Sequence, residues 1–235
     1  MPNSDTSNSD TLSFRQFVSK LPVFLTGIPD RAKGLYIANR KSNNKAVGLA
    51  VCLEKATRRN PEGTALIFED RELSYQQFNA WVNRLADSLA KTGTKKGDVV
   101  AVFVENRPEL LACIAAISKV GGVSALLNTS QRGGVLEHSI QLVKPARIIV
   151  GEELFCAVME VETILPKGEN AKLYLSDCDT LSDKTSAPEG WMDLAEKACS
   201  GYSKNPISSN DQRANEPFCY FYTSGTTGLP KAAIL

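Results

Sequence analysis

The stretch that decides the fold is GDVVAVFVENRPELLACIAAISKVGGVSALLNTSQRG, residues 97–133. Residues 98–104 form an almost continuous apolar run, which is typical of a strand buried on both faces. A second apolar run follows at residues 123–127, and the segment between the two runs has helical character. A strand, a helix and a strand in this order predict a βαβ unit and therefore a parallel sheet.

The helix inside this unit has clear start and stop signals. Asn106 is a capping residue type, Pro108 falls in the first turn, and Glu109 is an acid beside it. The Gly121–Gly122 pair then ends the helix. These signals predict a helix that starts just after the first strand and runs to about Val120.

The alternation of helix and strand continues on both sides of this unit. A second helix is marked by Ser74 and Gln77, which form an S-x-x-Q capping box ahead of an apolar stripe. Residues 177–216 are mostly polar and turn-rich. Helices are also predicted over residues 47–59, 133–143, 152–165 and 191–197, and strands over 64–68, 147–150, 171–175 and 218–222. The predicted fold class is α/β, with layered βαβ units around largely parallel sheets.

Composition and charge restrict the class of partner. The 235 residues are 43% hydrophobic and 23% charged, with a formal net charge of +1. Such a chain has no global basic field for nucleic acid, so no nucleic-acid partner is expected. The short basic groups Lys55–Arg58–Arg59 and Lys95–Lys96 are interpreted as solvated helix and loop positions.

The cysteines and the apolar segments bear on location. None of the six cysteines, at 52, 113, 156, 178, 199 and 219, has metal-ligand spacing, so no metal site is predicted and buried free thiols in a reducing compartment are expected. Residues 110–127 contain Lys119 and a Gly-Gly pair, and fall short of a membrane span. The N-terminus lacks a secretory signal, and residues 1–45 are predicted to be a disordered leader followed by an extended arm. A cytoplasmic location is expected, with peripheral membrane contact left open.

The chemistry-bearing stretch is YTSGTTGLPK, residues 222–231, which follows the last of these strands. Gly225 and Gly228 let the backbone take positive φ and approach a ligand closely. Four hydroxyl side chains lie among them, and Lys231 adds a point charge suited to phosphate oxygens. Successive amides of such a loop can form an anion-binding nest. These are the groups that hold a polyphosphate.

The spacing differs from that of the P-loop of nucleotide triphosphatases. That pattern is G-x-x-x-x-G-K-[ST] at the start of a helix. Here Lys231 comes three residues after Gly228, Ala232 replaces the hydroxyl residue, and KAAIL has the character of a strand. A strand–loop–strand phosphate clamp is therefore predicted.

YTSGTTGLPK resembles the signature of the adenylate-forming, or AMP-binding, superfamily, which includes acyl-CoA synthetases, luciferases and peptide-synthetase adenylation domains. Residues 97–133 are similar to the branch of fatty acid transport proteins and very-long-chain acyl-CoA synthetases. The shared features are the N-R-P-E helix start, the K-x-G-G turn and the L-x-N-T-x-x-R stretch. The resemblance covers about residues 45–235, and it departs at the N-terminus, where some members carry a membrane segment. Two interpretations of Asn128–Arg132 are open: the stretch forms a turn and a helix cap, or it has a functional role.

The resemblance implies a two-step ligation. ATP converts a fatty acid to an acyl adenylate with release of pyrophosphate, and the thiol of CoA then displaces AMP. The expected partners are fatty acid, ATP and CoA, with Mg²⁺ bridging the phosphates. The residues implied to hold the phosphates are Thr223, Ser224, Gly225, Thr226, Thr227, Gly228 and Lys231.

The resemblance also implies that residues 46–235 are an incomplete N-terminal AMP-binding domain that stops after the phosphate loop. The family's acidic metal motif, adenine pocket and catalytic lysine are expected beyond Leu235, and a chain end inside an apolar strand favours a longer enzyme. The expected function of that enzyme is ATP-dependent long-chain or very-long-chain fatty acid–CoA ligation, linked to fatty acid uptake and lipid metabolism. The alternatives are a non-catalytic truncated product, or another acid–CoA ligase such as a carnitine- or aryl-CoA ligase.

Overall fold

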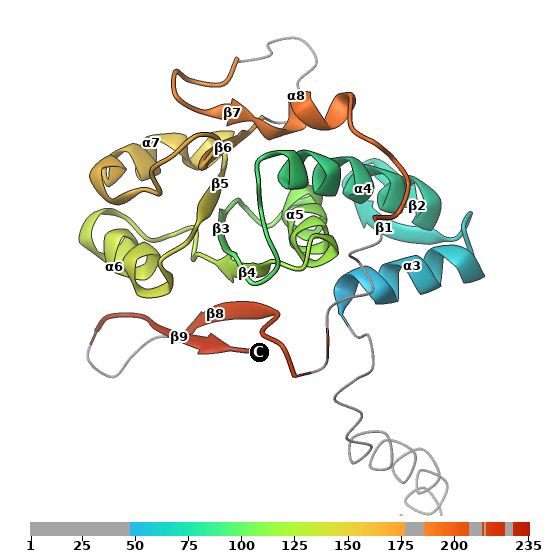
Figure 1. The fold of residues 1–235 in the computed structure, drawn as a ribbon, viewed down its shortest axis with the longest axis horizontal. Helices are drawn as coiled ribbons and strands as arrows, with labels where there is room; N and C mark the ends of the chain where they lie inside the picture. Colours follow the sequence, from blue (N-terminus) through green and yellow to red (C-terminus); the bar gives the residue numbers. More distant parts are fainter. Residues whose placement is uncertain (1–47, 177–185, 207–212, 214, 224–227) are drawn as a thin grey trace, which may run out of the picture. The chain divides into compact units, whose positions relative to one another are not determined.

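The computed structural model describes residues 48–176, 186–206, 213, 215–223 and 228–235. The arm predicted over residues 1–45 therefore lies outside the described residues. Within the described ranges the main feature is a seven-stranded sheet in the order β7-β6-β5-β3-β4-β8-β9, and a separate two-stranded sheet pairs β1 with β2 (Figure 1). The strands are β1 Thr64–Phe68, β2 Arg71–Ser74, β3 Val99–Phe103, β4 Val123–Leu126, β5 Arg147–Gly151, β6 Lys172–Leu175, β7 Met192–Asp193, β8 Cys219–Thr223 and β9 Lys231–Ile234.

The main sheet is parallel except at one edge. Neighbouring strands from β7 to β8 all run in the same direction, and only β9 pairs antiparallel, with β8. The prediction of an α/β fold with a largely parallel sheet is thus confirmed. Parallel strands in the middle of a sheet are covered on both faces, which explains their continuous apolar sequence.

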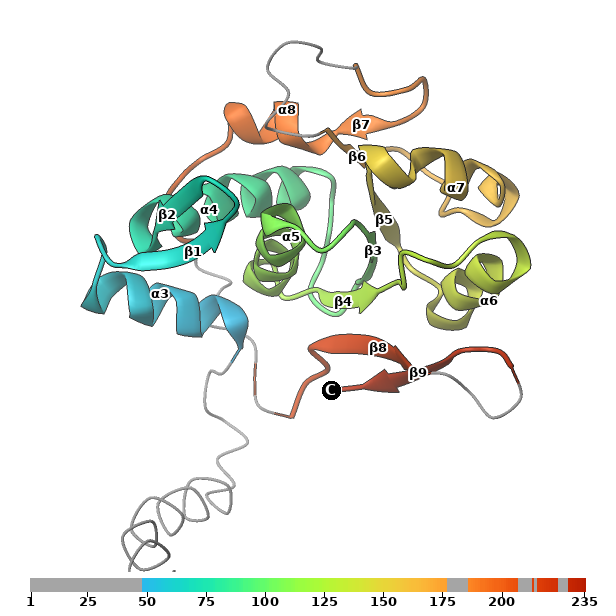
Figure 2. The same cartoon turned by 180° about the vertical axis from the view of Figure 1, so that it is seen from behind.

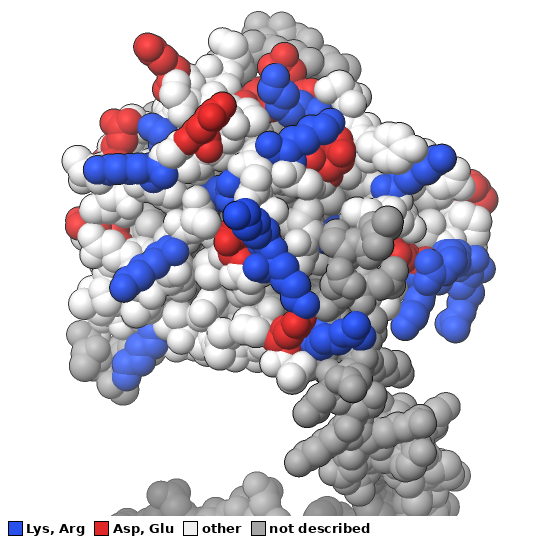
Figure 3. Space-filling view, viewed as in Figure 1, with Lys and Arg blue, Asp and Glu red and all other residues white. Residues whose placement is uncertain are grey.

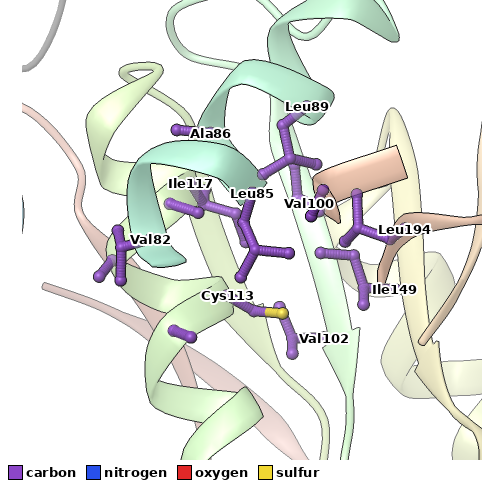
Figure 4. Packing of buried hydrophobic residues seen from close by; sticks show 14 of the residues in the cluster. Val82, Leu85, Ala86, Leu89, Val100, Val102, Cys113, Ile117, Ile149 and Leu194 are labelled. Atoms are coloured by element: carbon purple, nitrogen blue, oxygen red, sulfur yellow. The ribbon is translucent and has the colours of Figure 1, made fainter. Parts of the chain in front are cut away.

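Helices cover both faces of this sheet, and the strand alternation divides the core between them. Val100 and Val102 of β3 face one layer, in which α4 and α5 pack together with α8 (Figure 4). Ala101 and Phe103 face the other layer, which contains α6 and α7. Figures 1 and 2 show the sheet between these two sets of helices, with α3 beside α5. The helices are α3 Leu49–Arg59, α4 Tyr75–Lys91, α5 Pro108–Lys119, α6 Gly133–Val143, α7 Phe155–Met159 and α8 Leu194–Cys199.

The start of α4 has the predicted capping box. The Ser74 hydroxyl accepts a hydrogen bond from the Gln77 N–H at 3.2 Å, and the Gln77 side chain accepts one from the Ser74 N–H at 2.9 Å. Two backbone donors that the helix itself leaves unpaired are satisfied in this way.

Three predicted helix boundaries are wrong. Helix α5 is capped by Arg107 rather than Asn106, because a proline at the first helical position forces the residue before it into extended backbone. The segment 152–165 is not one helix: α7 is flanked by two 3₁₀ turns, at 152–154 and 162–164. Apolar spacings of three residues suit both helix types, so periodicity could not reveal these breaks. The helix predicted over 191–197 starts later, after the short strand β7, with Asp193 as its cap.

A buried polar cluster connects the helical layer to the segment that leads toward β8. The Lys119 ammonium lies 2.8 Å from the Glu54 carboxylate and donates to the Asn205 side-chain oxygen at 3.2 Å. The amides of Asn79 and Asn83 donate to the same oxygen, each at 2.9 Å. Asn205 is thus held by α4 and α5 together, although it lies far from both in the sequence.

The basic residues of α3 are exposed as predicted, whereas the cysteines agree with the prediction only in part. Lys55, Arg58 and Arg59 are exposed, and Figure 3 shows a group of basic side chains over α3. All five described cysteines are thiols, but only Cys113 and Cys219 are buried, so the expectation of generally buried thiols is wrong for Cys52, Cys156 and Cys199. Cys178 lies outside the described residues. Within the described ranges, no helix is both long and apolar enough to cross a membrane.

Candidate phosphate-binding hairpin

The predicted phosphate loop connects β8 to β9. Strand β8 runs parallel to β4, so its carboxyl end lies at the same edge of the sheet as the carboxyl end of β4. The chain returns antiparallel as β9, which begins at Lys231. A strand, and not a helix, follows the loop, which confirms the strand–loop–strand arrangement and separates it from the P-loop of nucleotide triphosphatases.

Two of the predicted phosphate ligands face each other across this hairpin. Thr223 is the last residue of β8 and is directly opposite Lys231 in the ladder. Directly opposed residues project on the same face of a sheet, and both of these side chains are exposed. The hairpin therefore presents a hydroxyl and an ammonium group side by side to solvent.

Gly228 shows why this loop needs glycine. Its φ of +83° lies in the left-handed region, which side chains with a Cβ rarely adopt. Among the described residues, a Cβ at this position would meet no heavy atom within 4 Å, so the requirement that they show is conformational and not steric. Ser224, Gly225, Thr226 and Thr227, the other predicted ligands, lie outside the described residues.

Helix α6 contacts the hairpin on both sides of its connecting loop. The Tyr222 hydroxyl donates a hydrogen bond to the Ser139 carbonyl at 2.8 Å. The His138 Nε2 lies 3.1 Å from the Pro230 carbonyl, and because a carbonyl only accepts, this nitrogen carries the hydrogen. Burial raises the pKa of Tyr222 well above its usual range, which keeps the hydroxyl protonated as a donor.

These α6 contacts were missed by the sequence reasoning. Tyr222 is part of the quoted motif, but the motif predicts a role in phosphate binding only for the Thr, Ser, Gly and Lys residues that follow it. His138 is the single histidine of the chain, and its sequence neighbours carry no signal that connects it to the loop. Its contact with Pro230 spans 92 residues, and no local pattern encodes such a contact.

The stretch Asn128–Arg132 forms the turn before α6. The Asn128 side-chain oxygen accepts from the Ser130 N–H at 2.9 Å and from its hydroxyl at 2.7 Å. The Arg132 guanidinium donates to the carbonyls of Thr129 and Gln131, and Arg132 is the cap residue of α6. These bonds are those of a turn, and Arg132 caps α6 by its backbone position without a side-chain cap hydrogen bond. They fit the structural interpretation of this stretch, and the functional interpretation stays a prediction.

A second group of polar side chains lies at the carboxyl ends of β3 and β5. The strands from β4 to β7 have the doubly wound order, in which ligands commonly bind at the point where the strand order reverses, between β3 and β5. Here the Glu153 carboxylate occupies that edge. It accepts from the Glu105 N–H at 2.8 Å and from the Arg107 guanidinium at 3.1 Å. Gly151 makes room for it, since a Cβ there would lie 2.3 Å from the carboxylate.

Comparisons with known proteins agree with this fold and motif. A sequence profile described as "AMP-binding enzyme" matches residues 53–235. The medium/long-chain-fatty-acid–CoA ligase FadD6 of Mycobacterium tuberculosis is 28% identical over 225 residues, which are 96% of this chain and 35% of that protein. Long-chain fatty acid transport protein 1 of Mus musculus is 34% identical over 191 residues, 78% of this chain and 28% of that protein. The chain thus spans about a third of the length of these relatives or less.

Solved structures show the same fold at lower identity. The anthranilate CoA ligase AuaEII, in complex with anthranoyl-AMP, aligns with a TM-score of 0.70 and 20% identity, over 80% of this chain and 34% of that one. The N-terminal domain of FACL13 from Mycobacterium tuberculosis aligns with a TM-score of 0.64 and 23% identity, over 80% of this chain and 44% of that one. The described fold is therefore that of the N-terminal domains of adenylate-forming enzymes. With the profile match covering most of its length, the chain belongs to the AMP-binding enzyme family.

Proposed function

We propose that residues 46–235 are the first part of the N-terminal domain of an ATP-dependent fatty acid–CoA ligase that acts on long-chain or very-long-chain acids. In this proposal the β8–β9 hairpin binds the phosphates of ATP. The pairing of Thr223 with Lys231 at the end of the hairpin carries the proposal, because it places a hydroxyl donor beside a positive charge on an exposed face. Both groups are suited to phosphate oxygens.

The chemistry requires phosphates that are held and neutralised. A carboxylate is a poor acyl donor, and attack on the α-phosphorus of ATP makes it a reactive acyl adenylate while pyrophosphate leaves. In the proposed site Lys231 offsets the negative charge of the departing phosphates, and the Thr223 hydroxyl donates a hydrogen bond to them. Gly228 lets the backbone between them turn back at positive φ.

Magnesium is compatible with this site on chemical grounds. Within the described ranges, no group of three or more His, Cys, Asp or Glu side chains could form a protein-only metal site. Mg²⁺ needs no such group when it is held mainly by phosphate oxygens with few protein ligands. The hydroxyls of Thr223, Ser224, Thr226 and Thr227 are candidates for those few ligands. The ion would neutralise part of the phosphate charge.

The proposed class of acid substrate is supported by the names of the relatives, and not by an acid-binding pocket in this chain. FadD6 is named for medium- and long-chain fatty acids, and the mouse relative for long-chain fatty acid transport. A link to fatty acid uptake and lipid metabolism, with a cytoplasmic or membrane-peripheral location, belongs to the same proposal. Other acid–CoA ligases such as carnitine- or aryl-CoA ligases remain the competing class, and a non-catalytic product of this length is the other alternative.

The test of the activity uses the longer enzyme that we propose to contain this chain. Exchange of labelled pyrophosphate into ATP is expected with a long-chain fatty acid such as palmitate, and not with benzoate, anthranilate or carnitine. Exchange with one of those three acids alone would reassign the substrate class. An enzyme without exchange on any acid would contradict the proposal. The 235-residue chain alone is expected to form no acyl-CoA, while binding inorganic tripolyphosphate.

The test of the site is Lys231→Ala in the same enzyme. Loss of a charge-assisted phosphate contact is expected to raise KM for ATP by about 10- to 100-fold and to leave KM for the fatty acid unchanged. Lys197→Ala is the matched control, because Lys197 is an exposed lysine of α8, an element far along the sheet from the hairpin. Equal ATP dependence in both variants would remove Lys231 from the site.

A further inference from the structure

The two contacts between α6 and the hairpin come from neighbouring residues of one helix. Ser139 accepts from the Tyr222 hydroxyl, and His138 donates to the Pro230 carbonyl. Tyr222 immediately precedes Thr223, and Pro230 immediately precedes Lys231. Each contact is therefore one residue away from a proposed phosphate ligand.

The hairpin needs such support because its own pairing is limited. Strand β9 is an edge strand, paired within the described residues only with β8, and most of its residues are exposed. Strand β8 is joined to the rest of the sheet through β4, whereas β9 has β8 as its one neighbour in the described part of the sheet. The position of Lys231 therefore depends on that single ladder and on contacts from outside the sheet.

Helix α6 is a firm base for these contacts. Leu136 is 0% exposed and Ile140 is 1% exposed, and both belong to the core on that face of the sheet. His138 and Ser139 lie between them on the same helix. The core thus fixes α6, and α6 in turn contacts the hairpin on both sides of its connecting loop.

We propose that α6 positions the phosphate-binding hairpin, with His138 and Tyr222 as its positioning residues. Neither side chain contacts phosphate in this proposal. They hold the two strand ends so that Thr223 and Lys231 stay opposed before ATP arrives, which lowers the ordering cost of binding. This inference rests on the proposed function for its ligand, although the support itself is independent of any ligand.

The support is tested without a ligand by amide hydrogen exchange on the 235-residue chain. His138→Leu removes one donor and Tyr222→Phe removes the other. Both are expected to speed exchange of the β9 amides, residues 231–234, by about threefold to tenfold, with β3 unchanged. His138→Gln retains an N–H donor of similar reach and is expected to restore protection. Gln141→Leu is the control on α6, since Gln141 bonds only to Glu137 in the described contacts. Unchanged β9 exchange in both donor-removing variants would overturn the inference.

The positioning role is tested by calorimetric titration of the same proteins with inorganic tripolyphosphate and with ATP. His138→Leu and Tyr222→Phe are each expected to weaken binding by about threefold to tenfold, and His138→Gln and Gln141→Leu to leave it unchanged. Faster β9 exchange with unaltered affinity would show a purely structural contact and overturn the positioning role. If the unmodified chain binds neither ligand while the exchange results hold, the proposed function fails and the support stands.

Discussion

Lys119 is a fully buried charged residue, and its neighbours determine what it contributes to the free energy of unfolding. Its relative exposure is 0%, and its nearest partner is the Glu54 carboxylate. Desolvation by burial lowers the pKa of Lys119, and the hydrogen bond to Glu54 acts in the opposite direction. A buried pair of this kind adds little compared with apolar residues, but loss of one member leaves a charge without compensation.

We expect Lys119→Met to lower the free energy of unfolding by about 3–5 kcal/mol, because it leaves the Glu54 carboxylate buried without its ammonium partner. The double variant Glu54→Leu with Lys119→Met is expected to recover a large part of that loss. Arg58→Met is the control: Arg58 lies 3.8 Å from Glu54 but is largely exposed, so a change of at most about 1 kcal/mol is expected. Urea unfolding measures all three, and a double variant as unstable as the single one would contradict the argument.

The buried Cys219 thiol is expected to make the folded chain less stable at alkaline pH. Burial raises the pKa of its thiol from 9.0 to about 11. Between those two values the folded chain holds the proton and the unfolded chain releases it, so the free energy of unfolding falls as pH rises from 9 to 11. Below pH 9 the contribution is fully present.

Cys219→Ala is expected to flatten this fall, which urea midpoints at pH 8, 10 and 11 would measure. The comparison with the unmodified chain removes the similar contribution of Tyr222, because Tyr222 is present in both proteins. The exposed Cys199 provides the control, and Cys199→Ala should leave the pH dependence unchanged. Parallel curves for the unmodified chain and Cys219→Ala would contradict the assignment.

At the scale of single elements, the capping box of α4 is the clearest case of a local sequence signal with a measurable cost. Ser74→Ala removes the acceptor for the Gln77 N–H and is expected to destabilise the chain by about 1 kcal/mol. Ser200→Ala is the control, because the Ser200 hydroxyl bonds a carbonyl at the exposed end of α8. Thermal or urea unfolding distinguishes the two. An equal loss of stability in the two variants would contradict a specific contribution of the Ser74 cap.

Signals of this local kind explain how much of the fold the sequence could predict. Helix α6 was predicted with its observed ends, residues 133–143, and the central strands lie where continuous apolar runs predicted them. The segment 152–165 was predicted as one helix because its apolar spacing fits α and 3₁₀ turns alike. The residue type favours Asn106 as the cap of α5, but Pro108 holds Arg107 in extended backbone and makes Arg107 the cap.

The site was predictable only in its local part. A glycine-rich motif with a lysine indicates ligand chemistry within ten residues. Thr223, Gly228 and Lys231 are predicted as phosphate ligands in this way, and that role stays a prediction although the structure describes their positions. The ligands predicted at 224–227 lie outside the described residues and stay predictions. The contacts that position the hairpin come from α6, and the ion pair of Lys119 with Glu54 spans 65 residues. Such contacts arise from tertiary packing, which local propensity does not encode.

At the scale of the whole chain, β9 leaves an open sheet edge within the described residues. Phe221, Ile234 and Leu235 are 43%, 51% and 69% exposed on or beside this hairpin. The aligned region makes up 35% and 28% of the length of the two relatives described above. An open apolar edge pairs readily with another chain.

We therefore expect the 235-residue chain to self-associate at micromolar concentration, because the β9 edge offers unpaired backbone groups beside apolar side chains. Ile234→Lys is expected to reduce this association, as measured by sedimentation velocity over a concentration series. Ile67→Lys is the matched control, since Ile67 is 70% exposed on β1 of the separate small sheet. Equal reduction by both substitutions would indicate general apolar adhesion and not edge pairing.

Glu153 has a consequence for how many anions the chain takes up. The backbone N–H of Glu105 and the guanidinium of Arg107, which could attract a phosphate at the reversal point of the sheet, already hold the Glu153 carboxylate. The Glu153 carboxylate thus competes with any dissolved anion for these two donors. We accordingly expect titration of the chain with phosphate compounds to show no binding at this edge beyond that of the proposed hairpin site.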